Sequence, residues 1–132
     1  MVIDSSALIA LLSGEPETAD FVAAIAAAPG RVVSAPTYLE TAIVILARSG
    51  PKAQEQLDRL LIDLEIEVVP FARDQAALAV SAYHKYGKGS GHAAGLNFGD
   101  CFSYALAKLR EEPLLFKGND FSRTDLLIAV VS

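Results

Sequence analysis

The sequence predicts an α/β fold in which a mostly parallel sheet is covered by helices on both faces. Short runs rich in Val, Ile and Leu alternate along the chain with longer segments of helical periodicity. This alternation is typical of parallel strands joined by crossover helices. Composition agrees, because 52% of the residues are apolar and 20% are charged, a balance typical of a globular domain. The 132 residues are expected to form one domain, spanning 1–132.

Five short apolar runs are predicted to be strands. Each is three to five residues long, too short for a helix but sufficient for a strand buried in a parallel sheet. The crossovers between them are expected to be right-handed because strands twist in one direction. The predicted strands are Met1–Ile3, Arg31–Ser34, Ile66–Pro70, Leu114–Lys117 and Leu127–Val131.

Between these runs, apolar residues recur at intervals of three and four residues. The pattern predicts helices over Ala53–Leu64, Asp74–Tyr86 and Phe98–Arg110. Another helix is expected to begin near Pro36, a residue favoured in a first helical turn, and to contain the very apolar run around Glu40. Helix boundaries are expected at Gly50-Pro51 and at Pro113, because proline cannot continue a helix.

Composition also restricts the cellular setting. Cys101 is the single cysteine, so no internal disulfide can form and a reducing cytoplasm is expected. The N-terminus lacks the pattern of a signal peptide. The longest uncharged apolar runs, near Thr41–Ala47 and Leu126–Val131, fall short of the roughly 20 residues of a membrane span. The net charge of −5 is unusual for a nucleic-acid-binding protein, whose affinity normally depends on Lys and Arg.

Four carboxylates lie close after predicted strands or near the starts of predicted helices. Asp4 and Asp120 follow strands, whereas Glu40 and Asp100 lie near the starts of helices. Each carboxylate also has a purely structural explanation. Asp4 and Asp120 could cap helices, and Glu40 and Asp100 could be acidic residues favoured by a helix dipole. Because ligands bind beyond the carboxyl ends of parallel strands, the joint pattern favours a single acidic site.

An acidic cluster of this kind favours a hard divalent cation. Carboxylates close together repel one another unless a cation neutralises them, and oxygen ligands suit Mg²⁺ or Mn²⁺. The sequence has no His or Cys pair at zinc-binding spacing. One or two such ions can activate water and stabilise charge on a phosphate. Phosphodiester hydrolysis is therefore the predicted chemistry.

Four segments resemble the PIN-domain family, and within it the VapC toxins of bacterial toxin–antitoxin pairs. They occur in the family's order, and the resemblance extends from Met1 to about Phe121. The first and third are its specific parts. The segments are Val2–Leu8, Ser34–Glu40, Asn97–Cys101 and Leu115–Phe121.

The resemblance implies a three-layer α/β/α sandwich and Mg²⁺-dependent endoribonuclease activity toward RNA. It also implies inhibition by a VapB-like antitoxin and a homodimer. Asp4 and Asp100 become the principal metal ligands. Glu40 joins them directly or through water, and Ser6 supports Asp4.

The last motif departs from the family pattern. Many relatives carry an acidic residue where this sequence has Gly118, so either Asp120 or Asn119 could complete the site. Lys117 and Arg123 lie beside the expected acidic edge and could contact RNA phosphates, or could simply be solvated surface residues. Cys101 is more typical of a small buried side chain than of a nucleophile.

Two other classes of protein compete with this interpretation. Phosphoryl-transfer enzymes of the haloacid-dehalogenase kind need a second Asp where this chain has Ser6, and no glycine-rich phosphate loop is present. A catalytically inactive PIN-like module that binds another protein remains the alternative. The net charge and the missing acid at Gly118 are compatible with it.

Overall fold

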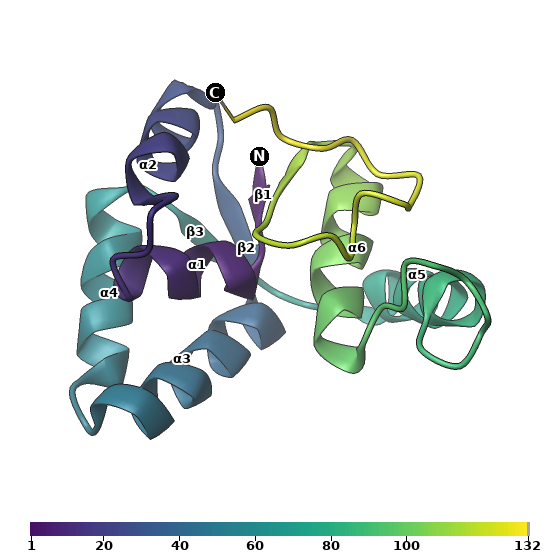
Figure 1. Cartoon of the computed structure of the whole chain (residues 1–132), viewed down its shortest axis with the longest axis horizontal. Coiled ribbons are helices and arrows are strands. Elements are labelled where there is room, and N and C mark those ends of the chain that lie inside the picture. The colour runs from purple at the N-terminus through teal and green to yellow at the C-terminus, as the bar shows by residue number, and fades with distance from the viewer. Residues whose placement is uncertain (132) are drawn as a thin grey trace.

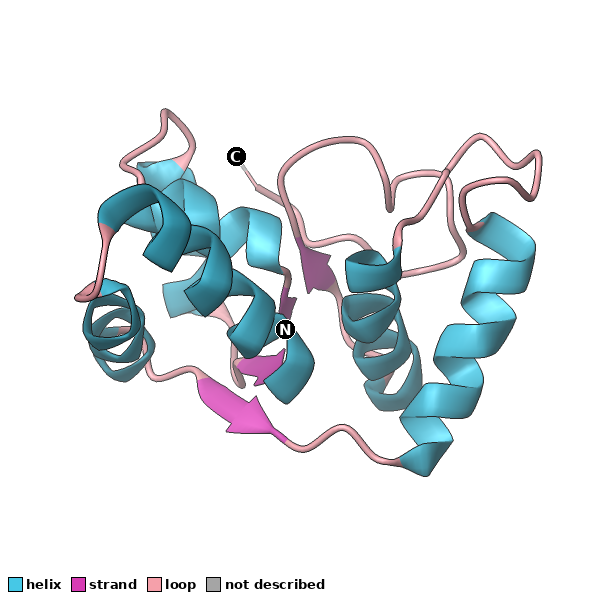
Figure 2. Ribbon diagram, turned by 90° about the horizontal axis from the view of Figure 1, so that it is seen from below, coloured by secondary structure: helices cyan, strands magenta, loops and turns pink. Residues whose placement is uncertain are grey.

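The computed structural model, described here for residues 1–131, has a parallel sheet between two groups of helices (Figures 1 and 2). Its four strands are ordered β3-β2-β1-β4, and every neighbouring pair is parallel. The predicted α/β class and three-layer sandwich are confirmed. The strands are β1 (Val2–Ile3), β2 (Val32–Ser34), β3 (Glu67–Val69) and β4 (Leu114–Leu115).

Six helices surround the sheet within residues 1–131. Figure 1 shows α1 to α4 on one side of the strands and α5 and α6 on the other. No helix in this part of the chain is long and apolar enough to cross a membrane. The helices are α1 (Ser5–Leu12), α2 (Thr18–Ala27), α3 (Ala35–Ser49), α4 (Ala53–Asp63), α5 (Arg73–Tyr86) and α6 (Phe98–Arg110).

The sheet separates two apolar cores because successive side chains of a strand point to opposite faces. Ile3, together with its neighbours Val33 and Leu115, packs into the core formed with α1, α2 and α4. Val2 and Val32 pack into the core formed with α5 and α6. The short strands are therefore covered on both faces, which explains why they are uniformly apolar in β1 and β4.

The predicted strand at Leu127–Val131 is wrong. Only one bridge forms there, between Leu114 and Ile128. It comprises a hydrogen bond from Leu114 N to Leu127 O and one from Ala129 N to Leu114 O, both 3.0 Å long. Val130 is 90% exposed, so the apolar run does not continue along the sheet edge. The other four strands are present but shorter than predicted.

Local signals locate the helices more closely. α6 begins and ends where the periodicity places it, and Asn97 and Asp100 form a capping box at its start. α3 carries Pro36 in its first turn and ends at Ser49, with Gly50 as its C-cap at a φ of +86° that suits glycine. No range was predicted for α2, whose alanine-rich sequence buries only Phe21 and Ile25 and so lacks a broad apolar stripe.

Candidate active site

A polar cavity of about 240 Å³ lies where β1 and β4 end and where α6 begins. All four carboxylates singled out in the sequence line it, although they come from four separate parts of the chain. Asp4 follows β1, Glu40 lies in the second turn of α3, Asp100 lies in the first turn of α6, and Asp120 follows β4. The complete lining is Asp4, Ser5, Ser6, Ile9, Glu40, Val44, Asn97, Asp100, Lys117, Asp120 and Phe121.

Asp4 is the most firmly held of the four carboxylates. It is 2% exposed and has the extended conformation of a helix N-cap, with φ −82° and ψ 159°. Its Oδ2 accepts hydrogen bonds from Ser6 N at 3.1 Å and Ser6 Oγ at 2.7 Å. Its Oδ1 accepts one from Ser103 Oγ at 2.5 Å. Asp4 thus caps α1, as its ordinary interpretation expects, and also lines the cavity.

Asp100 is buried in the first turn of α6, with 9% of its surface exposed. Asn97 N donates to its Oδ2 at 3.0 Å, and Asp100 N donates to Asn97 Oδ1 at 2.9 Å. Burial raises the pKa of Asp100 to about 7 against the opposing hydrogen bond from Asn97, with further contributions from the charges of Asp4 and Asp120. Burial and the neighbouring carboxylates therefore favour the protonated form of Asp100 when no cation is bound.

Glu40 reaches the cavity because Gly99 has no side chain. A Cβ placed on Gly99 would lie 2.8 Å from Cδ and 2.9 Å from Oε1 of Glu40, and closer still to Oε2. The carboxylate of α3 therefore rests against the backbone at the start of α6. The Gly-Asp pair in the segment Asn97–Cys101 thus serves two purposes, since Gly99 leaves room for Glu40 and Asp100 provides a second carboxylate.

Asp120 lies on the irregular segment that connects β4 to the C-terminal bridge, and its side chain is exposed. No helix follows it within residues 1–131, so the alternative interpretation as a helix cap is wrong. Its contact with Asp100 contributes to the raised pKa of that residue. Phe121, which follows it, is 1% exposed and packs on Phe116 with ring centroids 5.1 Å apart.

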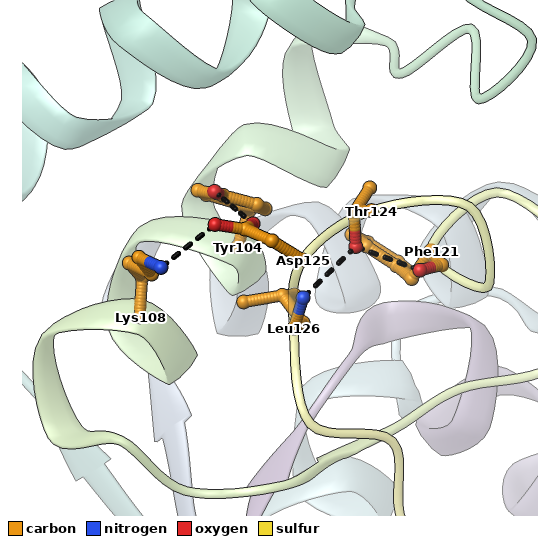
Figure 3. Close-up of polar contacts among 6 residues, drawn as sticks. All are labelled: Tyr104, Lys108, Phe121, Thr124, Asp125 and Leu126. Atoms are coloured by element: carbon orange, nitrogen blue, oxygen red, sulfur yellow. Dashed lines mark hydrogen bonds and ion pairs between the residues drawn. The ribbon is translucent and has the colours of Figure 1, made fainter.

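A polar clamp fixes the far end of this segment to α6 (Figure 3). Asp125 accepts a hydrogen bond from the Tyr104 hydroxyl at 2.5 Å and one from Lys108 Nζ at 2.7 Å. Thr124 Oγ1 donates to the carbonyl of Phe121 at 2.7 Å. Because Tyr104 lies one turn beyond Asp100, the clamp joins the segment bearing Asp120 to the helix bearing Asp100.

Lys117 is the cation at the rim of the cavity. Its Nζ pairs with Glu15 at 3.1 Å and with Glu17 at 3.3 Å, and its backbone N–H donates to Ser6 Oγ at 2.9 Å. Ser6 therefore connects Asp4 to the chain that follows β4.

The other two candidates after β4 lie outside the cavity lining. Asn119 and Arg123 are both exposed, and the Asn119 carbonyl accepts a hydrogen bond from Ser122 Oγ at 2.8 Å. The structure thus brings Asp120, rather than Asn119, to the acidic cavity.

Cys101 stands beside Asp100 but is a poor nucleophile. It is 4% exposed, and burial, together with the charge of Asp100, raises the pKa of its thiol to about 11. The reactive form of cysteine is the thiolate, so this side chain acts as a small buried group.

The donor chemistry of the cavity fits a hard divalent cation. Carboxylate oxygens are what Mg²⁺ and Mn²⁺ prefer, and burial, together with the charges of Asp4 and Asp120, raises the pKa of Asp100. Within residues 1–131, no three His, Cys, Asp or Glu side chains converge closely enough to hold an ion as they stand. An ion would therefore need side-chain rotation and bridging waters, and Mg²⁺ commonly retains several of its waters.

Sequence reasoning missed two buried hydroxyl groups beneath the cavity. Ser103 donates to Asp4, and Thr37 lies next to Ser103, with 3.4 Å between their Oγ atoms. The signal for Ser103 was its position three residues after Asp100, which puts both on one face of a helix. Nothing local to Thr37 indicated that α3 would pack beside it.

The fold and the acidic cavity together define a PIN domain. The sequence profile of the PIN domain matches residues 1–127, and the chain belongs to this family. Two solved structures share the fold. The Mycobacterium tuberculosis protein VapC20, described as a Sarcin-Ricin loop cleaving toxin, has a TM-score of 0.78 at 18% identity, and the match covers 99% of this chain and 98% of that one. A toxin–antitoxin complex from Klebsiella pneumoniae has a TM-score of 0.70 at 22% identity, with 96% and 94% covered.

Sequence relatives place the chain more narrowly within that family. Ribonuclease VapC30 of Mycobacterium tuberculosis is 52% identical over 126 residues, which cover 96% of this chain and 95% of the relative. Ribonuclease VapC of Mycolicibacterium smegmatis is 51% identical over 126 residues, covering 96% and 97%. The protein is a VapC-type member of the PIN ribonuclease family.

Proposed function

We propose that this protein is a divalent-metal-dependent endoribonuclease that hydrolyses RNA phosphodiester bonds as the toxin of a VapBC-type toxin–antitoxin pair. The observation that carries the proposal is the convergence of Asp4, Glu40, Asp100 and Asp120 on one cavity. The raised pKa of Asp100, caused first by burial and further by the charges of Asp4 and Asp120, supports it, because a bound cation would relieve the repulsion between these carboxylates. The similarity to VapC ribonucleases over 96% of the chain supports the choice of RNA.

In this proposal each side chain has a separate role. Asp4 and Asp100 are the principal ligands of Mg²⁺, or of Mn²⁺, and Glu40 and Asp120 bind it directly or through water. A bound cation would lower the pKa of water and neutralise charge on the scissile phosphate. Ser6 orients Asp4 through two hydrogen bonds.

The rim of the cavity would receive the RNA. Lys117 lies at this rim, where its ammonium group can contact a phosphate once it leaves Glu15 and Glu17. Arg123 is exposed on the same segment and offers a second contact. Few cations lie close to the acidic cavity, so the bound metal would provide much of the local positive charge.

The proposed partners are a VapB-like antitoxin and a second copy of this chain, acting in the cytoplasm. The exposed apolar stripe of α3, in which Leu39, Ile43 and Leu46 are 58%, 55% and 51% exposed, supports a protein partner. Light scattering of the purified protein, alone and co-expressed with the product of a neighbouring antitoxin gene, would measure both assemblies. A protein that remained a monomer in both samples would contradict this part of the proposal.

The nuclease is tested by incubating purified, partner-free protein with a panel of structured RNAs in Mg²⁺ or EDTA. The parent is compared with Asp100→Asn and with Asp74→Asn, which makes the same change in the first turn of α5. Cleavage that requires both the metal and Asp100, and that survives in Asp74→Asn, is the expected result. Equal cleavage by Asp100→Asn would overturn the assignment of the site. If the parent neither cleaves RNA nor binds Mn²⁺, the inactive protein-binding module is the better interpretation.

A further inference from the structure

A buried chain of hydroxyl groups lies directly beneath the acidic cavity. Ser103 Oγ donates to Asp4 Oδ1 at 2.5 Å, and Thr37 Oγ1 lies 3.4 Å from Ser103 Oγ. Ser103 and Thr37 are both 0% exposed and Asp4 is 2% exposed. Water therefore cannot readily replace either hydroxyl as a partner of the carboxylate.

The direction of these hydrogen bonds follows from the number of protons. A serine hydroxyl has one hydrogen, and an ionised carboxylate can only accept. Ser103 uses its hydrogen on Asp4, so in any bond with Thr37 it must be the acceptor. Thr37 is then the donor, and its own carbonyl accepts from Thr41 Oγ1 at 2.8 Å. The bonds run in one direction, from Thr37 through Ser103 to Asp4, which strengthens each of them.

Asp4 has little freedom left once these bonds form. A carboxylate has about four lone-pair positions. Ser6 occupies two positions on Oδ2, through its backbone N–H and its hydroxyl. Ser103 occupies one on Oδ1. One position on Oδ1 remains for a cation, and its direction is set by the bond to Ser103.

The series of hydrogen bonds from Thr37 to Asp4 also joins the three elements that bear the buried or half-buried carboxylates. Asp4 follows β1, Thr37 lies one turn before Glu40 on α3, and Ser103 lies one turn after Asp100 on α6. A change in any of these hydrogen bonds would alter the spacing between the ligands. Hydrogen-bond partners of metal ligands commonly have this orienting effect.

We propose that Ser103 is a positioning residue that orients the Asp4 carboxylate toward the divalent cation, with Thr37 holding Ser103 in place. The inference rests on the proposed function, since it assumes that Asp4 is a metal ligand. Ser103 touches neither the cation nor RNA; it acts through Asp4.

Mn²⁺ binding to the full chain, measured by electron paramagnetic resonance and calorimetry, tests the proposal separately from catalysis. Ser103→Ala removes the donor and should weaken Mn²⁺ binding roughly 10- to 100-fold, the usual effect of losing such a partner. Thr37→Val keeps the shape of the side chain and should produce a smaller loss in the same direction. In RNA cleavage, Ser103→Ala should raise the metal concentration needed for half-maximal rate while leaving the KM for RNA unchanged.

Ser34→Ala is the matched control. Ser34 is 1% exposed at the end of β2, and its Oγ has no hydrogen-bond partner among the described residues. The Ser34→Ala protein should bind Mn²⁺ with the affinity of the parent. Parental Mn²⁺ affinity in a folded Ser103→Ala protein, or an equal loss in Ser34→Ala, would overturn the positioning role alone. If Ser103→Ala does not fold by circular dichroism, Thr37→Val decides on the same criterion. A parent that binds no Mn²⁺ would overturn the metal site itself, and this inference with it.

Discussion

The carboxylate of Glu40 occupies the space that a side chain at position 99 would fill, so Gly99 and Glu40 act as a pair. A Cβ at Gly99 would lie 2.8 Å from Cδ of Glu40. The clash falls on the end of a flexible side chain, so the fold can absorb it by moving the carboxylate. The position of a proposed ligand thus depends on a neighbour that has no functional group.

Gly99→Ala should therefore impair the site without unfolding the protein. Alanine is favoured over glycine within a helix by up to about 1 kcal/mol, so thermal stability should not fall. Displacement of Glu40 should weaken Mn²⁺ binding and RNA cleavage roughly 10- to 100-fold. Gly30→Ala is the control, because its Cβ would meet nothing within 4 Å. Unchanged Mn²⁺ affinity in Gly99→Ala would show that Glu40 is not needed for the metal.

The raised pKa of Asp100 predicts a pH-dependent stability of the metal-free protein. Burial shifts the pKa from 3.8 to about 7, so the folded state binds this proton more tightly than the unfolded state. The resulting stabilisation is full below pH 3.8 and is lost as the pH rises toward about 7. Urea unfolding in EDTA should thus show that the unfolding free energy of the parent falls over this pH range. The fall should be smaller in Asp100→Asn. Identical pH profiles for the two proteins would contradict the shift.

Metal binding should depend on pH for the same reason. A ligand must lose its proton before it binds a cation, so the affinity for Mn²⁺ should fall as the pH drops below about 7, the pKa of Asp100. For one proton the loss approaches about tenfold per pH unit. Calorimetry between pH 5.5 and 8 in two buffers of different ionisation enthalpy, a range chosen to bracket about 7, would also detect the released proton. Affinity that did not change with pH would be inconsistent with Asp100 as a ligand.

The clamp around Asp125 predicts an order of destabilisation. Asp125→Ala leaves the Tyr104 hydroxyl without its acceptor, which should cost about 1–3 kcal/mol of unfolding free energy. Tyr104→Phe removes the hydroxyl itself and leaves Asp125 paired with Lys108, so it should cost less, about 0.5–1.5 kcal/mol. Arg110→Ala, which breaks an exposed pair with Glu112, should cost no more than about 1 kcal/mol. Urea unfolding measures all three, and a larger loss in Arg110→Ala than in Asp125→Ala would contradict the role of the clamp.

The position of Lys117 at the rim of the cavity predicts that its substitution changes the salt dependence of RNA binding. Lys117→Met should lower affinity and reduce the slope of log affinity against log salt concentration by about 0.7 for a single-stranded RNA. Arg123→Met tests the second expected contact in the same way. Lys52→Met, at the exposed start of α4 outside the cavity, is the control. Fluorescence anisotropy at several salt concentrations with Asp100→Asn protein would avoid cleavage during the measurement, and an unchanged slope for Lys117→Met would exclude a phosphate contact.

Prediction from sequence worked best where the signal was local. The capping box of Asn97 and Asp100 marks the start of α6 in the sequence itself, and both ends of that helix were located correctly. The run Leu127–Val131 has strand composition, but a strand needs a partner along its whole length, and only Ile128 forms a bridge. An apolar sequence cannot indicate how far the neighbouring edge extends.

By itself, the sequence determined the alternation of strands and helices and placed Asp4 and Asp120 after strands and Glu40 and Asp100 in early helical turns. Tertiary structure alone decided that these carboxylates line one cavity, and that Asp120 rather than Asn119 does so. It also decided that Ser103 meets Asp4, from which it is separated by 99 positions. The physical reason is that periodicity and capping act between neighbours in the chain. Contacts between distant residues depend instead on strand order and on how the helices pack across the sheet.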